Sequence, residues 1–185
     1  MQESQRPIKI EYGIPKVSQA IAEFMASCKA KENTRYALAN VGIIKGQMAV
    51  TDGRRLLVVT PTDSFDPPIA KGAYHLTGEG FLLKTDDKGK FPNWRDVIPK
   101  DAKNLGDFVL DDGTGYGTAK IIKAVFDTKI TLNVSWLLKA LSRLKSCQCS
   151  SVAISKEDGD QSVMITADSM GAHFQYIQMP FSKPE

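Results

Sequence analysis

The sequence offers few residues for catalytic chemistry, and the best candidate is the run LDDGTGYGTAKI at residues 110–121. Its paired carboxylates, Asp111 and Asp112, could hold a metal ion, and its three glycines could cradle a phosphate. A phosphate loop must open a helix, so that free N–H groups and the helix dipole meet the anion. The residues that follow, TAKIIKAVF, are rich in β-branched side chains and predict a strand. We therefore interpret the run as a glycine-rich hairpin.

The cysteines and histidines form no pattern typical of a site. Cys28, Cys147 and Cys149 are an odd number of thiols, and the opening MQESQRPIKIEYG lacks the apolar core of a signal peptide. Zinc needs four ligands, or three and a water, whereas His75 and His173 are isolated in the sequence. We expect a cytoplasmic protein that is not an enzyme and has neither a metal nor a cofactor.

The bulk composition is that of an ordinary globular protein. The 185 residues are 42% hydrophobic and carry a net charge of +3, which is too mild to indicate a nucleic-acid partner by itself. No apolar run approaches the roughly 20 residues of a membrane span, so no membrane partner is expected.

The stretch AVTDGRRLLVV places a Thr-Asp-Gly turn between two apolar runs. Asp-Gly between such runs is a strong hairpin signal, because glycine accepts the positive φ that tight turns need. The doublet Arg54-Arg55, placed where the second strand resumes, leaves another interpretation open. In that interpretation the turn forms the edge of a binding site.

The remaining pattern predicts an α+β fold with two helices, at 15–30 and 133–146, and many short strands. Residues 8–60 and 128–180 both read as β-α-β-β-β, which suggests an internal duplication. We divide the chain into a first half-domain at 1–60, a β-rich insertion or connecting lobe at 61–127, and a second half-domain at 128–185. No third long helix is expected.

Four stretches together resemble a known family. They are TRYALANVGIIKGQMAVTDGRRLLVV, GKFPNWRDVIPK, LNVSWLLKALSRLKS and YIQMPF, and they are similar to segments of the bacterial DNA polymerase III beta subunit, the sliding clamp, in the family's order. The resemblance covers about half of the chain, and a clamp subunit has three domains and about twice this length, so the sequence looks like a shortened or divergent member. It implies a DNA-clamp-like fold of duplicated β-α-β-β-β units with antiparallel sheets, whose helices face DNA.

The resemblance also implies a peptide-binding pocket. Carried over residue by residue, it would be built from Thr51, Gly53, Arg54, Arg55, Leu56, Pro92, Val97, Ile177, Met179 and Pro180. Three positions depart from the family: Arg54, Trp94 and Asp96 stand where histidine, tyrosine and arginine are usual, and Asp96 reverses a charge. A hairpin, a proline-bounded loop and a last core strand without a binding role remain the alternative interpretation.

A DNA contact is predicted on the second helix, where Lys139 and Arg143 are four residues apart and so share one face. These cations could meet phosphates, or they could simply form the solvated side of the helix. The expected partners are double-stranded DNA without sequence preference, a DNA polymerase or other clamp-binding protein, and further copies of the chain. One hypothesis is a processivity or scaffold clamp around DNA; the other is a non-encircling, peptide-binding regulator of replication proteins.

Overall fold

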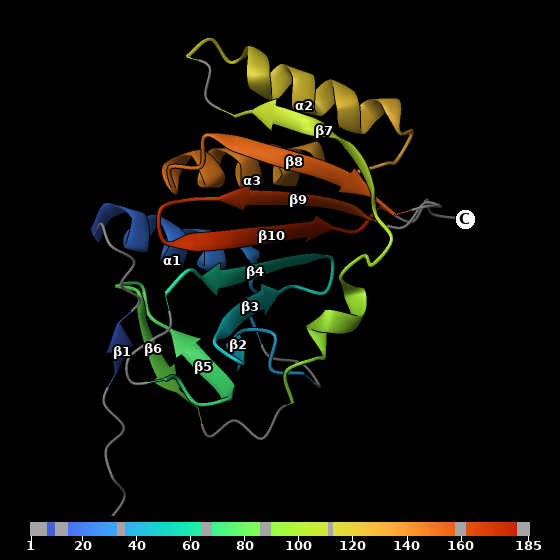
Figure 1. The fold of residues 1–185 in the computed structure, drawn as a ribbon. Helices are drawn as coiled ribbons and strands as arrows, with labels where there is room; N and C mark the ends of the chain where they lie inside the picture. Colours follow the sequence, from blue (N-terminus) through green and yellow to red (C-terminus); the bar gives the residue numbers. More distant parts are fainter. Residues whose placement is uncertain are drawn as a thin grey trace, which may run out of the picture.

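A single antiparallel sheet organises the protein (Figure 1). The computed structural model describes residues 7–9, 15–32, 36–63, 68–85, 90–110, 113–157 and 162–180. The strand order is β1-β6-β5-β2-β3-β4-β10-β9-β8-β7. The strands are β1 (Ile8–Lys9), β2 (Val41–Ile44), β3 (Gln47–Thr51), β4 (Arg55–Pro61), β5 (Gly72–Leu76), β6 (Phe81–Lys84), β7 (Lys103–Val109), β8 (Ser151–Lys156), β9 (Val163–Asp168) and β10 (Ala172–Gln178).

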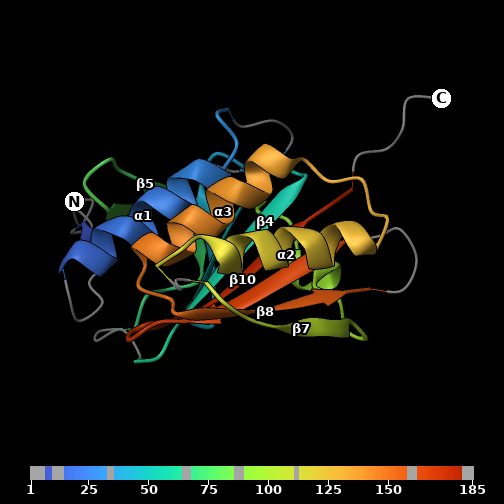
Figure 2. The ribbon, with the colours of Figure 1, turned by 90° about the horizontal axis from the view of Figure 1, so that it is seen from above.

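The α-β-β-β part of the predicted duplication is present in the centre of this sheet, whereas the second copy lacks the predicted first strand. Helix α1 (Pro15–Cys28) precedes β2, β3 and β4, and helix α3 (Val134–Ser146) precedes β8, β9 and β10. The last strands of the two series, β4 and β10, pair with each other, and α1 and α3 lie side by side on one face of the sheet (Figure 2). The α+β clamp-like fold with antiparallel strands and helices at both predicted positions is therefore confirmed.

The prediction of only two helices is wrong, because residues 116–127 form a third helix, α2 (Tyr116–Asp127). Its buried residues, Gly117, Ile121 and Val125, recur every four positions and so lie on one face of a helix. Burial of this stripe outweighs the strand preference of the β-branched side chains. The segment predicted as a β-rich insertion thus contains a helix as well as strands.

The glycine-rich run before α2 also differs from the expected hairpin. Gly113 and Gly115 have φ values of 72° and 78° and lead into the helix, while Asp111 and Asp112 lie outside the described residues. The helix packs on an antiparallel strand, β7, and does not belong to the parallel β-α-β unit that a dinucleotide-binding glycine loop requires. Residues 129–133, which read KITLN and have a strand-like composition, form the connection between α2 and α3 and contain no strand.

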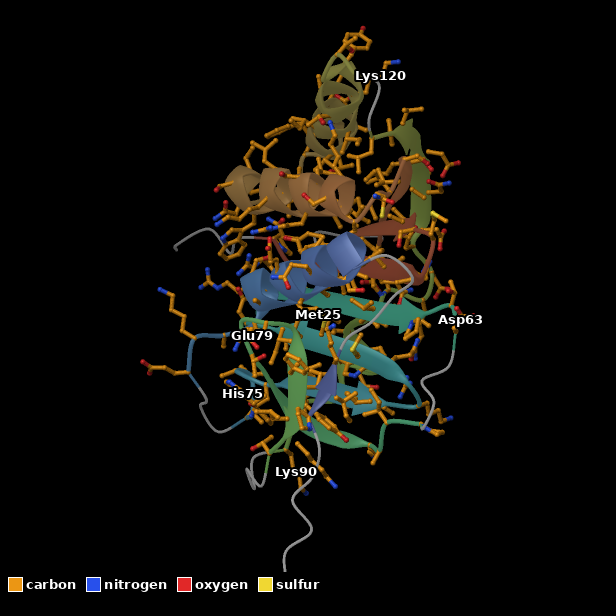
Figure 3. The ribbon with its side chains drawn as sticks, turned by 90° about the vertical axis from the view of Figure 1, so that its left-hand side faces the viewer. Met25, Asp63, His75, Glu79, Lys90 and Lys120 are labelled. Atoms are coloured by element: carbon orange, nitrogen blue, oxygen red, sulfur yellow. The ribbon has the colours of Figure 1, made fainter. Side chains whose placement is uncertain are left out.

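The main core lies between the helices and the sheet. The ring of Phe24 on α1 lies 6.3 Å from that of Phe174 and 6.1 Å from that of Tyr176, both on β10. Met25 of α1, which is labelled in Figure 3, is also buried in the main core. These contacts join the first helix to the last strand, so each of these two elements is stabilised by packing against the other.

Strand β4 is buried on both faces. Leu57 and Val59 belong to the main core, whereas Leu56 and Val58 belong to a second cluster on the opposite face. Because successive side chains of a strand alternate between faces, a strand covered on both sides needs an uninterrupted apolar run. This explains the sequence LLVV.

The buried centre of β4 predicts a large loss of stability on truncation. Leu57→Ala should lower the free energy of unfolding by about 2–5 kcal/mol, because it leaves a cavity in the main core. Leu83→Ala is the matched control, since Leu83 is 38% exposed, and it should cost under about 1 kcal/mol. Urea denaturation followed by circular dichroism measures both, and equal losses would contradict this account of the core.

Candidate functional site

Four separate segments of the chain meet around one cavity of about 250 Å³. It is lined by Tyr36, Leu38, Thr51, Gly53, Arg54, Arg55, Leu56, Pro92, Asn93, Trp94, Val97, Ile177 and Met179, and these residues are called the pocket below. Nine of the ten residues predicted for a peptide site are in this set. The tenth, Pro180, is half-buried beside Met179 but does not line the cavity.

The pocket has a buried apolar floor and a more open rim. Leu56 and Ile177 are 4% and 1% exposed and belong to the second cluster, on the sheet face opposite the helices. Val97 and Met179 are 49% and 39% exposed and stand at the rim. An apolar group that enters from solvent would therefore pass the exposed side chains of Val97 and Met179 and contact the buried side chains of Leu56 and Ile177.

The Thr-Asp-Gly turn is held by its own side chains. The Thr51 hydroxyl donates to the Arg55 carbonyl at 2.6 Å and accepts from the Gly53 N–H at 3.0 Å. Asp52 Oδ1 accepts from the backbone N–H groups of Arg54 and Arg55 at 3.0 and 2.8 Å. Gly53 has a φ of 89°, which explains the glycine here. The turn is a rigid wall, because its polar groups are satisfied internally.

Arg55 lines the pocket, but its guanidinium group is engaged elsewhere. Nε and Nη2 donate to Asp52 Oδ2 at 2.9 and 2.6 Å, and the guanidinium carbon lies 4.5 Å from the ring centre of Trp136 on α3. Arg55 alternates with Leu56, so its side chain belongs to the helix side of the sheet. It therefore anchors the turn to α3 through an ion pair and a cation–π contact.

The C-terminal wall is an extension of the sheet. The Met179 N–H donates to the Arg54 carbonyl at 2.9 Å, which continues the pairing of β4 and β10 by one step. This bond fixes the Met179 backbone beside the turn and leaves its side chain at the rim.

The third wall is the segment around the short 3-10 helix η1 (Trp94–Val97), which lies on the sheet face away from the helices (Figure 1). Trp94 is 2% exposed and packs in the second cluster. The Arg95 guanidinium carbon lies 4.6 Å from the Trp94 ring centre, and its Nη2 donates to Gln47 Oε1 on β3 at 2.8 Å. Asp96 accepts from the Asn93 side chain at 2.7 Å and does not line the pocket. The charge reversal at Asp96 thus lies beside the cavity.

Trp94 also carries an unusual polar atom. Its indole Nε1 is buried and has no hydrogen-bond partner among the described residues. A buried donor without an acceptor costs about 1–3 kcal/mol of folding stability. Packing of the Trp94 ring in the second cluster therefore comes with a loss of folding stability from its unpaired N–H group.

Tyr36 and Leu38 line the pocket but were not predicted from the sequence. They belong to the segment between α1 and β2, which is docked by the Ala30 N–H donating to both Leu38 O and Thr51 O at 3.2 Å. This contact joins the end of α1 to two walls of the pocket. The sequence pattern predicts one strand over YALANVGII, whereas β2 begins only at Val41, so Tyr36 and Leu38 lie in the segment before it.

The two predicted DNA contacts have different surroundings. Lys139 is exposed on α3, whereas Arg143 forms an ion pair through Nη1 with Glu23 Oε2 on α1. On the same helix Leu137, Leu141 and Leu144 are buried, as the helical spacing predicts, but Leu138 is 42% exposed. The outer face of α3 is therefore less basic than its sequence suggests.

The described residues include no group of three or more potential metal ligands among His, Cys, Asp and Glu. All three cysteines are buried as free thiols, and burial raises the pKa of Cys147 and of Cys149 to about 12. The thiols are thus protonated at neutral pH, which makes them poor nucleophiles. His75 lies on the exposed surface (Figure 3). Among the described helices none has the length and apolar character to cross a membrane.

Comparison with protein-family models finds no match, and no curated protein matches the sequence. The structure, in contrast, resembles solved sliding clamps over its whole length. DNA polymerase III subunit beta of Borrelia burgdorferi, solved with a natural product, matches 100% of this chain with a TM-score of 0.65 and 14% identity. A DnaN sliding clamp of Pseudomonas aeruginosa bound to griselimycin matches 99% of this chain, with a TM-score of 0.62 and 14% identity. The beta sliding clamp of C. crescentus also matches 99% of this chain, with a TM-score of 0.65 and 12% identity.

These matches show that the chain has the fold of the DNA polymerase III beta subunits. It spans about two thirds of their length, with 66%, 68% and 67% of the three chains covered. At 12–14% identity the similarity is one of fold.

The packing of Phe91 predicts that Gly42 supports the pocket from a distance. A Cβ added to Gly42 on β2 would lie 2.4 Å from the Phe91 ring, next to the segment that carries Trp94. Gly42→Ala should therefore push this segment outward, lower the free energy of unfolding by about 1–3 kcal/mol and shift the tryptophan emission. Urea denaturation and fluorescence test this expectation.

Gly78→Ala is the matched control for this substitution, because nothing lies within 4 Å of its added Cβ. It should leave both readouts near their original values. An identical response of the two variants would contradict the role assigned to Gly42.

Proposed function

We propose that this chain is a sliding-clamp-like scaffold that holds short peptides of a DNA polymerase or other replication proteins in the pocket, while several copies assemble around duplex DNA. The observation that carries the proposal is the pocket itself. Nine residues expected from a clamp-like pattern, on three separate segments, line one cavity within a single chain. The proposal is for binding and scaffolding, without a catalytic step.

The shape of the pocket supports a peptide as its ligand. A volume of about 250 Å³ is below the roughly 300–1,000 Å³ of typical small-molecule sites, so it suits one or two apolar side chains of a longer chain. The floor of Leu56 and Ile177 is buried before any ligand arrives, which reduces the ordering that binding requires. Met179 at the rim can adapt to different side chains.

The helix face supports the DNA part of the proposal. Helices α1 and α3 lie side by side on the face opposite the pocket, and Lys139 is exposed there. Several copies would repeat this lysine around a central hole, where contacts to phosphates carry no sequence information. Among the described strands the sheet ends at β1 and β7, and such open edges are available for pairing between copies.

A second candidate is a clamp-derived regulator that binds the same peptides without enclosing DNA. The ion pair between Arg143 and Glu23 favours it, because this pair neutralises one of the two cations expected to meet phosphates. Both candidates require the pocket. They differ in assembly and in the use of α3.

The peptide part predicts a role for Met179. A peptide with a glutamine, a following leucine and a terminal aromatic residue should bind, and Met179→Ala should weaken binding by about 1–3 kcal/mol if the side chain closes over the ligand. Met170→Ala is the matched control, since Met170 is 82% exposed outside the pocket. Fluorescence anisotropy of a labelled peptide gives the affinities. Unchanged binding in the Met179 variant would remove this residue from the site.

The DNA part predicts a role for Lys139. Lys139→Ala should weaken binding to duplex DNA for every sequence tested and reduce the salt slope by about 1 per contact in the assembly. Lys84→Ala, at an exposed lysine on β6, should leave both unchanged. Filter binding across a salt series provides both quantities.

Assembly around DNA also predicts a longer lifetime on closed circular DNA than on linear DNA with free ends. Light scattering across a concentration series gives the solution mass of the same sample. Equal lifetimes on the two substrates, together with a monomeric mass, would reject the encircling assembly and leave the regulator.

A further inference from the structure

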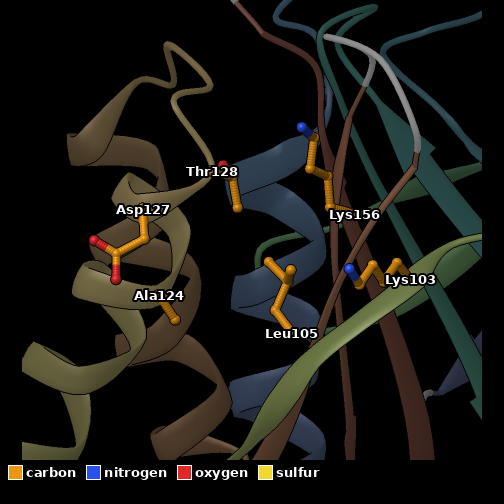
Figure 4. A pocket seen from close by; sticks show the side chains of 6 residues that line it. All are labelled: Lys103, Leu105, Ala124, Asp127, Thr128 and Lys156. Atoms are coloured by element: carbon orange, nitrogen blue, oxygen red, sulfur yellow. The ribbon is translucent and has the colours of Figure 1, made fainter.

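A second cavity, of about 450 Å³, lies between the outer strands and helix α2 (Figure 4). It is lined by Lys103 and Leu105 of β7, Lys156 of β8, Ala124 and Asp127 of α2, and Thr128. This cavity shares no residue with the pocket, and neither the clamp-like resemblance nor the proposed function assigns it a role.

Two lysines lie beside each other on the strand side of this cavity. Lys103 and Lys156 are direct partners in the antiparallel pairing of β7 and β8, so their side chains lie on the same face of the sheet. Like charges directly opposite each other destabilise a strand pair. In the described part of the chain, neither ammonium group has an ion-pair partner. Lys103 is exposed and Lys156 is half-buried, so water solvates both charges, and an anion that enters the cavity would meet the two together.

The carboxylate that lines the cavity does not neutralise these two charges. Asp127 is bound to Lys123 on the same helix at 2.6 Å, and Figure 4 shows its carboxylate turned away from both lysines. The Thr128 hydroxyl donates to the Val125 carbonyl at 2.6 Å. The cavity wall formed by α2 thus offers no free negative charge to the lysines.

The rest of the lining is apolar. Leu105 is half-buried and packs against the main core, and Ala124 is half-buried on α2. A ligand that fits both features carries a doubly charged group for the lysines and an organic part for this surface. A phosphate monoester has a charge of about −1.5 to −2 at neutral pH, whereas a single carboxylate balances only one lysine.

We infer that this cavity is a binding site for a phosphate monoester, whose phosphate lies between Lys103 and Lys156 and whose organic part covers Leu105 and Ala124. Lysine binds phosphate as a point charge, so the site needs charge and proximity more than a fixed hydrogen-bond geometry. The inference is independent of the proposed function, and its failure would leave the pocket and the DNA face untouched.

Adenosine monophosphate is the probe, titrated by calorimetry at constant ionic strength, with adenosine and inorganic phosphate as comparisons. The nucleotide should bind, adenosine should not, and inorganic phosphate should bind more weakly because it lacks the organic part. Lys103→Gln and Lys156→Gln should each weaken nucleotide binding about tenfold or more, as expected for the loss of one charged contact.

Two further variants separate the site from general surface charge. Lys103→Arg keeps the charge and should retain binding, and Lys84→Gln, on β6 near the opposite end of the sheet, should have no effect. The glutamine variants should melt no lower than the original protein without ligand, because each removes a like-charge repulsion. Absent nucleotide binding, or equal affinity in the original protein and both glutamine variants, would overturn the inference.

Discussion

Strands β4 and β10 pair over seven residues each, from Arg55 opposite Gln178 to Pro61 opposite Ala172. Among the described strands this pairing alone joins β1–β6 to β7–β10 within the sheet. It also sets the Thr-Asp-Gly turn beside the end of β10, where the Met179 N–H donates to the Arg54 carbonyl. Two of the pocket walls therefore exist as neighbours because the two series of strands meet at this one ladder.

The same ladder couples the two faces of the sheet. On one face Leu56 and Ile177 form the pocket floor, and on the other Arg55 lies over Trp136 of α3. Gln178, at the end of β10, donates to the Asn133 carbonyl at 3.0 Å, and the Asn133 side chain caps α3 by accepting from Trp136. The start of α3 is thus fixed by the strands that hold the pocket.

The sequence allowed prediction of the elements whose apolar spacing is unambiguous. In helix α3, Leu137, Leu141 and Leu144 follow an asparagine cap at helical spacing. The observed helix begins one residue after the predicted start. The β-branched residues of α2 favour a strand when each is taken alone, whereas the spacing of Ile121 and Val125 favours a helix. Spacing was the better guide because tertiary burial overrides β-branched preference.

Nine of the pocket residues could be predicted because they lie on three short continuous segments, each with its own motif. Their partners could not. The contact of Arg55 with Trp136 joins residues 81 positions apart (136 − 55), and the ion pair of Arg143 with Glu23 joins residues 120 apart. Neither pair has a local sequence signal. The sequence therefore indicated most of the side chains that surround the cavity. It did not indicate that Arg55 is directed to the other face or that Arg143 is paired with Glu23 of α1.

The separation of the two faces bears on how a clamp-like scaffold could work. A residue pair such as Arg55 and Leu56 occupies adjacent positions of one strand, yet the first reaches the helix side and the second the pocket side. A peptide resting on Leu56 would therefore not compete for space with a partner on α1 and α3. The sheet is buried on both faces at β4, so the residues of the pocket floor are supported by close-packed side chains. Such packing resists compression when a ligand binds against the floor. This construction suits a scaffold that keeps one partner bound while another occupies the opposite face.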